Sequence, residues 1–193
     1  MKRRTLAAGL AGAFVLAACG REGSREAGKP AAAAAPVSLD VVAAEARGFN
    51  VGSTMSTRVA YVFFDPQCPH CAALWEAARP LRSQARFVWI PVSLLNDKSA
   101  PQGAAILGAP DPVAAMDEHE KSLRGQQGGI AAMGAPDAQK EAVRKNTELF
   151  NRFGFASVPT VVAKHAQSGD LVTIEGSVAT GVLASRLGLN PPA

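Results

Sequence analysis

Residues 59 to 75 read VAYVFFDPQCPHCAALW, and this segment combines a strand, a sharp break and the start of a helix. The run from Val59 to Phe64 is continuously apolar, as is typical of a strand buried on both faces. Residues 65 to 67 then interrupt it. From Pro69 onward, apolar side chains recur at steps of three and four residues, which predicts a helix. Cys68 is therefore expected where the strand ends and the helix begins.

The same two periodicities predict the remaining elements. We expect further strands over 87–92, 160–163 and 171–174, and helices over 39–47, 113–123, 137–153 and 178–187. Residues 96 to 136 are rich in Ala, Gly and Pro, and we interpret them as a helical insertion beside the sheet, with a flexible stretch from Gly125 to Gly134. Because a Cys-x-x-Cys motif directly follows a strand in this α/β order, the expected fold is thioredoxin-like.

The N-terminus has the features of a secretory signal. A basic cluster (Lys2, Arg3 and Arg4) precedes an apolar run that ends in Leu-Ala-Ala-Cys19. This end resembles the lipobox of bacterial lipoproteins, in which cleavage before the cysteine makes it the lipid-bearing first residue. The pattern predicts a signal peptide over 1–18 and a lipid on Cys19, with the protein anchored to a membrane and facing the periplasm. Ordinary cleavage nearby, leaving Cys19 as a free thiol, is the alternative.

Composition separates a tether from one folded domain. Residues 19–36 contain almost nothing apolar larger than Ala, so they cannot form a core and are expected to be a flexible tether. Residues 37–193 are long enough for a single domain with one hydrophobic core. Removal of the signal lowers the net charge from +4 to +1, because three basic residues leave with it. The charge therefore indicates no nucleic-acid partner.

Cysteine usage points to thiol chemistry rather than to a stapled scaffold. The chain has three cysteines, and lipidation of Cys19 leaves only Cys68 and Cys71, in the sequence Cys-Pro-His-Cys. A helix N-terminus stabilises a thiolate through its dipole and its free N–H groups. Cys68 is thus the expected nucleophile with a lowered pKa, and Cys71, one turn further, the resolving thiol. Pro69 suits the first helical turn, and His70 adds a polar or cationic neighbour that favours the thiolate.

Other roles for the pair are less well supported. A static disulfide closing so short a loop would stabilise the fold little. A zinc site needs two more ligands, and the other histidines, His119 and His165, lie in separate segments. Haem attachment needs a histidine after the second cysteine, where this chain has Ala72. We expect no metal and no cofactor beyond the redox-active Cys68–Cys71 pair.

Pro159 is the second candidate feature. It lies in Ser-Val-Pro-Thr, directly before the strand expected over 160–163. The bond between Val158 and Pro159 can be cis at modest cost, which would let the backbone before Pro159 face the cysteine pair. An ordinary trans proline at a strand edge is the alternative.

The chain resembles the catalytic domain of the periplasmic DsbC/DsbG family. The resemblance is carried by 61–75, by 104–108, by the helix through Asn146 and Phe153, and by Val158-Pro159, and it extends from about Leu39 to Leu189. It implies exchange by the cysteine pair, a cis Pro159 and substrate contacts at Val158 and Pro159. It also places Asp65 where the family carries an aspartate. A turn or helix-entry role for Asp65 is favoured over proton transfer.

The departures from the family concern assembly and the direction of electron flow. DsbC and DsbG have an N-terminal dimerisation domain, whereas only a tether and a short helix precede the first expected strand here, so a monomer is expected and isomerase activity is in doubt. Pro69-His70 and Val158 instead resemble the oxidase DsbA. The expected partners are protein thiols or disulfides and a membrane redox partner. Three alternatives stay open. The chain could be a DsbA-like thiol oxidase, a dedicated reductant of sulfenic acids or apocytochrome thiols, or a binding or assembly lipoprotein on the same fold.

Overall fold

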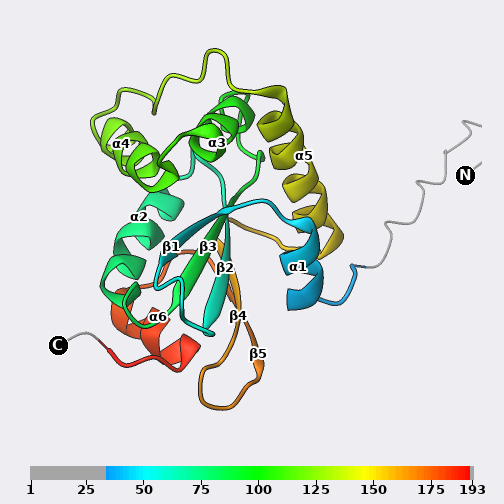
Figure 1. The fold of residues 1–193 in the computed structure, drawn as a ribbon, viewed down its shortest axis with the longest axis vertical. Coiled ribbons are helices and arrows are strands. Elements are labelled where there is room, and N and C mark those ends of the chain that lie inside the picture. Colours follow the sequence, from blue (N-terminus) through cyan, green and yellow to red (C-terminus); the bar gives the residue numbers. More distant parts are fainter. Residues whose placement is uncertain (1–33, 192–193) are drawn as a thin grey trace, which may run out of the picture. The chain divides into compact units, whose positions relative to one another are not determined.

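The computed structural model describes residues 34–191, which form a five-stranded mixed sheet with helices on both faces (Figure 1). The strands are β1 (Phe49–Gly52), β2 (Val59–Phe64), β3 (Arg86–Pro91), β4 (Thr160–Lys164) and β5 (Leu171–Glu175). The helices are α1 (Leu39–Glu45), α2 (Pro69–Ala78) with a 3₁₀ turn η1 (Arg79–Leu81), α3 (Ser99–Gly108), α4 (Pro112–Arg124), α5 (Asp137–Arg152) and α6 (Thr180–Leu187). The expected signal peptide, Cys19 and most of the expected tether lie outside the described residues.

The order of the strands in the sheet is β1-β3-β2-β4-β5. Strands β2 and β3 run parallel, with Val62 opposite Trp89, and all the other neighbours are antiparallel. Parallel neighbours need a crossover connection, which α2 and η1 provide. Because β2 is the central strand, α2 begins above the middle of the sheet.

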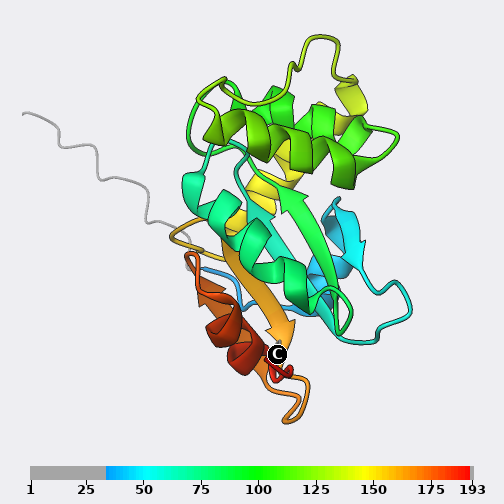
Figure 2. The same cartoon turned by 90° about the vertical axis from the view of Figure 1, so that its left-hand side faces the viewer.

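Alternate side chains of β2 enter two different cores. Val62 and Phe64 pack with α2 and α6, whereas Phe63 packs with α1 and α5. Figure 2 shows α2 and α6 in front of the sheet and α5 behind it. A strand covered on both faces needs apolar side chains at every position, which explains the unbroken apolar run of the sequence.

The insertion between β3 and α5 contains two helices. Helix α3 packs against α5, and α4 lies beside α2, where Trp75 Nε1 donates a hydrogen bond to Asp117 Oδ1 at 2.7 Å. Asp111 caps α4 by accepting from the N–H groups of Val113 and Ala114, both at 3.0 Å. Together α3 and α4 extend the fold above the end of the sheet where the cysteine pair lies (Figures 1 and 2).

The fold class expected from sequence is confirmed, and most element boundaries agree within one or two residues. Two elements differ from expectation. The first strand is β1 rather than β2, because the short segment Phe49–Gly52 pairs with the edge of β3. Helix α3 lies in the segment expected to be a helical insertion, in which only the helix over 113–123 was assigned bounds, and it is a regular helix of ten residues.

The start of the domain is bound to the end of α5. Ala35 N donates to Arg152 O at 2.8 Å, and Val37 packs on the core formed by α1 and α5. Residues 34–36, at the end of the expected tether, therefore contact the domain. None of the helices within residues 34–191 is both long and apolar enough to cross a membrane.

Candidate active site

The two cysteines lie at the N-terminal end of α2, directly above β2. Cys68 is the residue that precedes the first helical turn, with an extended backbone (φ −94°, ψ 114°), and Pro69 occupies the start of the helix. The Cys71 N–H donates to Cys68 O at 3.0 Å. Cys68 is 5% exposed and Cys71 is 0% exposed, so only Cys68 can be reached from solvent.

The environment of Cys68 favours its thiolate. Its pKa is lowered to about 6, chiefly because the Cys71 thiol donates a hydrogen bond to the Cys68 sulfur. The backbone groups of Cys71 and His70 and the charge of His70 act in the same direction, while burial opposes them. At neutral pH, Cys68 is therefore ionised and nucleophilic. The hydrogen bond from Cys71 contributes more than the charge of His70, whose side chain is exposed.

Cys71 has the opposite character. Burial raises its pKa well above the usual value, and the hydrogen bond that it donates to Cys68 and the nearby thiolate charge raise it further. Cys71 therefore keeps its proton while Cys68 has lost one. The two cysteines thus differ in the direction of their pKa shifts and in their access to solvent.

The segment before β4 completes the site. The peptide bond between Val158 and Pro159 is cis, which confirms the expectation from sequence. Val158 O lies 3.5 Å from Cys68 Sγ, and it accepts a hydrogen bond from Cys68 when that thiol is protonated. The segment reaches Cys68 because β4 pairs with β2, the strand that leads into the motif.

Asp65 connects the active-site loop, residues 65–67 between β2 and the cysteine motif, to the segment that follows β3. Its carboxylate is fully buried and accepts four hydrogen bonds. The donors are Gln67 N at 2.8 Å, Leu94 N at 2.7 Å, Leu95 N at 3.0 Å and Ser99 Oγ at 2.7 Å. These contacts agree with the turn role favoured from sequence.

His119 lies close to the cysteine motif in space, although it is distant in sequence. Its Nε2 lies 2.7 Å from Pro66 O, and its Nδ1 accepts from Ile130 N at 3.3 Å. Burial lowers its pKa, which favours the neutral ring. Both ring nitrogens are thus occupied by backbone groups. Within residues 34–191, no group of three or more His, Cys, Asp or Glu side chains is placed to hold a metal ion.

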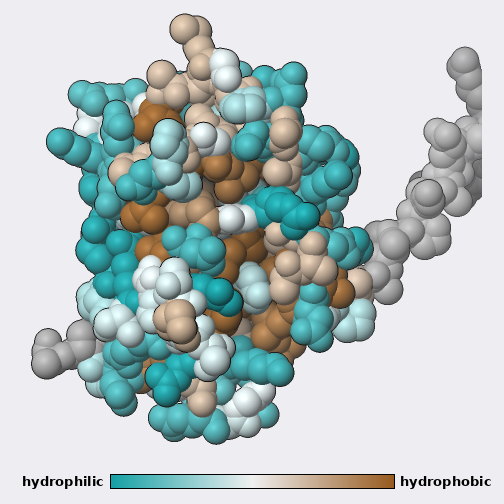
Figure 3. All heavy atoms as spheres, in the orientation of Figure 1, coloured by the Kyte–Doolittle hydropathy of each residue, from teal (hydrophilic) through white to brown (hydrophobic). Residues whose placement is uncertain are grey.

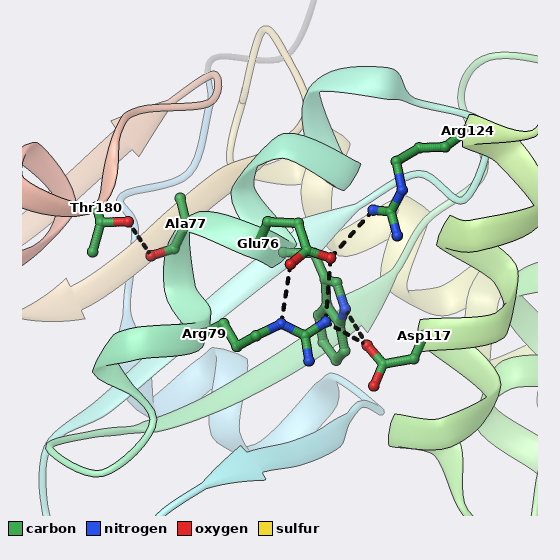
Figure 4. A network of polar contacts seen from close by, with 7 residues as sticks. Glu76, Ala77, Arg79, Asp117, Arg124 and Thr180 are labelled. Atoms are coloured by element: carbon green, nitrogen blue, oxygen red, sulfur yellow. Dashed lines mark hydrogen bonds and ion pairs between the residues drawn. The ribbon is translucent and has the colours of Figure 1, made fainter.

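A network of polar contacts fixes α2 between α4 and α6 (Figure 4). The contacts join Trp75 Nε1 and Arg79 Nη2 to Asp117, Arg124 Nη1 to Glu76, and Thr180 Oγ1 to Ala77 O. Exposed ion pairs each contribute little to stability. The hydrogen bond from the buried indole of Trp75 to Asp117 is therefore the strongest interaction between α2 and α4 in this network. This network holds the helix that carries both cysteines.

Sequence reasoning did not identify the polar residues of α4 as neighbours of the site. Met116, His119 and Glu120 are fully buried. They are spaced at i, i+3 and i+4, which places them on one face of a helix. That spacing was the signal available in the sequence, since two of these three residues are ionisable.

Two curated relatives are proteins named thiol:disulfide interchange protein DsbG. The protein from Pseudomonas aeruginosa is 30% identical over 140 residues, which cover 71% of this chain and 54% of the relative. The protein from Escherichia coli is 28% identical over 109 residues, which cover 53% of this chain and 42% of the relative. The chain thus spans about half the length of these relatives. No family model matches it.

Solved structures share the fold. The catalytic domain of Proteus mirabilis ScsC matches with a TM-score of 0.61 and 17% identity, over 77% of this chain and 92% of that domain. A periplasmic thioredoxin-like protein from Salmonella enterica matches with a TM-score of 0.62 and 16% identity, over 80% of this chain and 97% of that protein. A disulfide interchange protein from Neisseria gonorrhoeae matches with a TM-score of 0.57 and 21% identity, over 81% of this chain and 100% of that protein.

Proposed function

Because this chain carries a DsbG-like domain of the thioredoxin fold, we propose that it is a periplasmic thiol-disulfide oxidoreductase acting on protein substrates through Cys68 and Cys71. One observation carries the proposal. Two adjacent thiols at a helix N-terminus have their pKa values moved apart, Cys68 down to about 6 and Cys71 well upward. A purely structural domain has no need of this division.

The opposite pKa shifts of Cys68 and Cys71 suit a two-step disulfide exchange. In the first step, the Cys68 thiolate attacks a client disulfide, forms a mixed disulfide and releases one client thiolate. In the second step, Cys71 gives up its proton and attacks Cys68 Sγ. The second client sulfur leaves and is protonated, and the Cys68–Cys71 disulfide remains. Two electrons pass from the domain to the client, and the reverse sequence oxidises a client dithiol.

Client contacts are proposed at Val158 and Pro159. Val158 O lies 3.5 Å from Cys68 Sγ, so a backbone bound next to it would bring its own sulfur close to the nucleophile. Val158 is half-buried and Pro159 is buried, which leaves a shallow surface rather than a deep pocket. Such a surface suits an extended protein segment more than a small molecule.

The pKa of Cys68 bears on the direction of electron flow. A more stable thiolate stabilises the reduced form and makes the disulfide more oxidising. With a pKa of about 6, the Cys68 thiolate is less stabilised than that of DsbA, about 3.5, which favours a less oxidising disulfide. Because the curated relatives are DsbG proteins, we propose DsbG/DsbC-like reduction or isomerisation. Thiol oxidation is the second candidate, because Pro69-His70 and Val158 resemble DsbA.

A trapping experiment tests the proposal. The variant Cys71→Ser, incubated with an unfolded protein that contains a single disulfide, should accumulate a mixed disulfide on Cys68, visible by non-reducing electrophoresis and peptide mapping. Cys68→Ser should form none. Failure of Cys71→Ser to trap any client, with Cys68 accessible to alkylation, would instead favour a binding or assembly lipoprotein.

We further propose that Cys19 carries a lipid and that a membrane redox partner restores the working state of the cysteine pair. Incorporation of labelled palmitate, abolished by Cys19→Ser, tests the first part. The domain is also proposed to be a monomer. A stable dimer in sedimentation at micromolar concentration would contradict that state.

A further inference from the structure

Glu120 in α4 is an ionisable side chain in an unusual position. It is 0% exposed, and neither carboxylate oxygen has a hydrogen-bond partner. Burying a polar group without a hydrogen-bond partner destabilises the folded state, and a charged group does so more strongly. Glu118, two residues earlier in the same helix, is by contrast exposed. A group kept at such a cost, in the helix next to the redox centre, requires an explanation.

The geometry directs Glu120 toward the helix that carries the cysteines. Asp117, Glu120 and Arg124 follow one another at steps of three and four residues, so they share one face of α4. Asp117 and Arg124 both contact α2, as Figure 4 shows. Glu120 lies between them on that face, and therefore it faces α2 as well.

The charges around Glu120 come from α2 and from α4 itself. Burial is the main cause that raises its pKa to about 8, and Glu76, Cys68 and Asp117 add to the increase. Arg124 acts in the opposite direction, but it is also paired with Glu76. Strand β1 and helix α3 also pack against α4, and residues 49–52 and 99–108 contain no ionisable side chain. Cys68 is thus the neighbour of Glu120 whose charge changes with the redox state.

We propose that Glu120 is a positioning acid of the redox centre, which keeps its proton while Cys68 is a thiolate and releases it when Cys68 is held in a disulfide. The inference rests on the proposed function. Reduction of the Cys68–Cys71 disulfide by two electrons produces a thiolate on Cys68 and a thiol on Cys71. Formation of the Cys71 thiol consumes one proton. Glu120 has a higher pKa in the reduced protein than in the oxidised protein. In the pH range between these two pKa values, Glu120 takes up a second proton when the disulfide is reduced. The coupling is reciprocal, so an ionised Glu120 disfavours the Cys68 thiolate.

The first test follows the carboxyl group itself in the full chain with Cys19→Ser. The side-chain carboxyl carbon of Glu120, assigned by its loss in Glu120→Gln, is titrated by NMR. We expect a midpoint near pH 8 in the reduced protein and a lower midpoint in the oxidised protein. Reduced Cys68→Ser, which has no thiolate there, should match the oxidised protein. Equal midpoints in all three forms, or a midpoint near 4.5 in the reduced protein, would overturn the proposal.

The second test measures the effect on redox equilibrium. The ratio of reduced to oxidised protein in glutathione buffers is compared for wild type, Glu120→Gln and the control Glu118→Gln between about pH 6 and 9, a range that spans the Glu120 transition. At the acid end, all three should agree. At the alkaline end, Glu120→Gln should favour the reduced form by about tenfold for each pKa unit of coupling. Glu118→Gln should follow wild type throughout.

The outcomes separate this inference from the proposed function. If wild type exchanges with glutathione but Glu120→Gln follows it at every pH, Glu120 is not coupled to the cysteines and the inference fails alone. If wild type does not exchange at all, the proposed function fails. The NMR titration then still decides whether the Cys68 thiolate affects Glu120.

Discussion

Replacement of Cys71 by Ala should raise the pKa of Cys68 substantially. The largest cause of the lowered value of about 6 is the hydrogen bond that the Cys71 thiol donates to the Cys68 sulfur. A hydrogen bond to a charged group is worth about 1.5–3 kcal/mol, and 1.36 kcal/mol corresponds to about one pKa unit. The loss therefore predicts an increase of about 1–2 units, to a pKa between about 7 and 8. The backbone groups of the helix end keep it from rising further.

The measurement is the ultraviolet absorbance of the thiolate as a function of pH, in a Cys19→Ser background where Cys68 is the only remaining cysteine. Cys71→Ser is the matched control, because its hydroxyl can still donate to the Cys68 sulfur and should keep the pKa near 6. A Cys71→Ala protein whose Cys68 still titrates near 6 would show that the helix end alone stabilises the thiolate and that our ranking of causes is wrong.

Two further predictions concern stability. Asp65→Ala should lower the free energy of unfolding by at least about 3 kcal/mol, because it leaves the N–H groups of Leu94 and Leu95 and the hydroxyl of Ser99 without their acceptor. Urea denaturation measures this free energy. A loss no greater than that of the exposed control Asp170→Ala would refute the anchoring role of Asp65. For Glu120, the pKa is raised from 4.5 to about 8 on folding, so the folded state binds more protons and stability falls as pH rises through that interval. Glu120→Gln should remove that fall and be more stable than wild type at pH 7, and parallel stability curves for the two proteins across this interval would contradict the assignment.

The centre of the fold could be predicted from sequence because its burial leaves a local pattern. Residues 59–64 are apolar at every position, as a strand between two cores requires, and the break at 65–67 marks the turn into α2. The cysteine motif then fixes the site to a known place in that pattern. The cis bond before Pro159 was expected from its position before a strand and from the family resemblance.

The elements not predicted from sequence, β1 and α3, depend on contacts with residues that are distant in the chain. Strand β1 has only four residues, of which Phe49 and Val51 are buried, so it carries little periodic signal. Helix α3 contains Pro101 and Gly103, which are poor helix formers. At Gly103, an added Cβ would lie 3.0 Å from Pro91 Cβ, so the absence of a side chain lets α3 approach β3 closely. Tertiary packing, rather than local preference, forms this helix.

The polar residues of α4 were missed for a related reason. His119 and Glu120 are charged or polar types that usually face solvent, and only the packing of α4 against α2 and the active-site loop buries them. The surroundings of His119 and Glu120 are set by residues of α2 and of the active-site loop, which are distant from them in sequence.

Selective alkylation distinguishes the nucleophilic cysteine of the pair from the protected one. The reduced protein is treated with iodoacetamide at about pH 6.5, where free thiols of ordinary pKa are almost fully protonated, and the modified residues are mapped by mass spectrometry. We expect rapid modification of Cys68 and none of Cys71 until the protein is unfolded, because only Cys68 is ionised and retains some contact with solvent. Equal modification rates for the two cysteines in the native protein would contradict the assignment of Cys68 as the nucleophile.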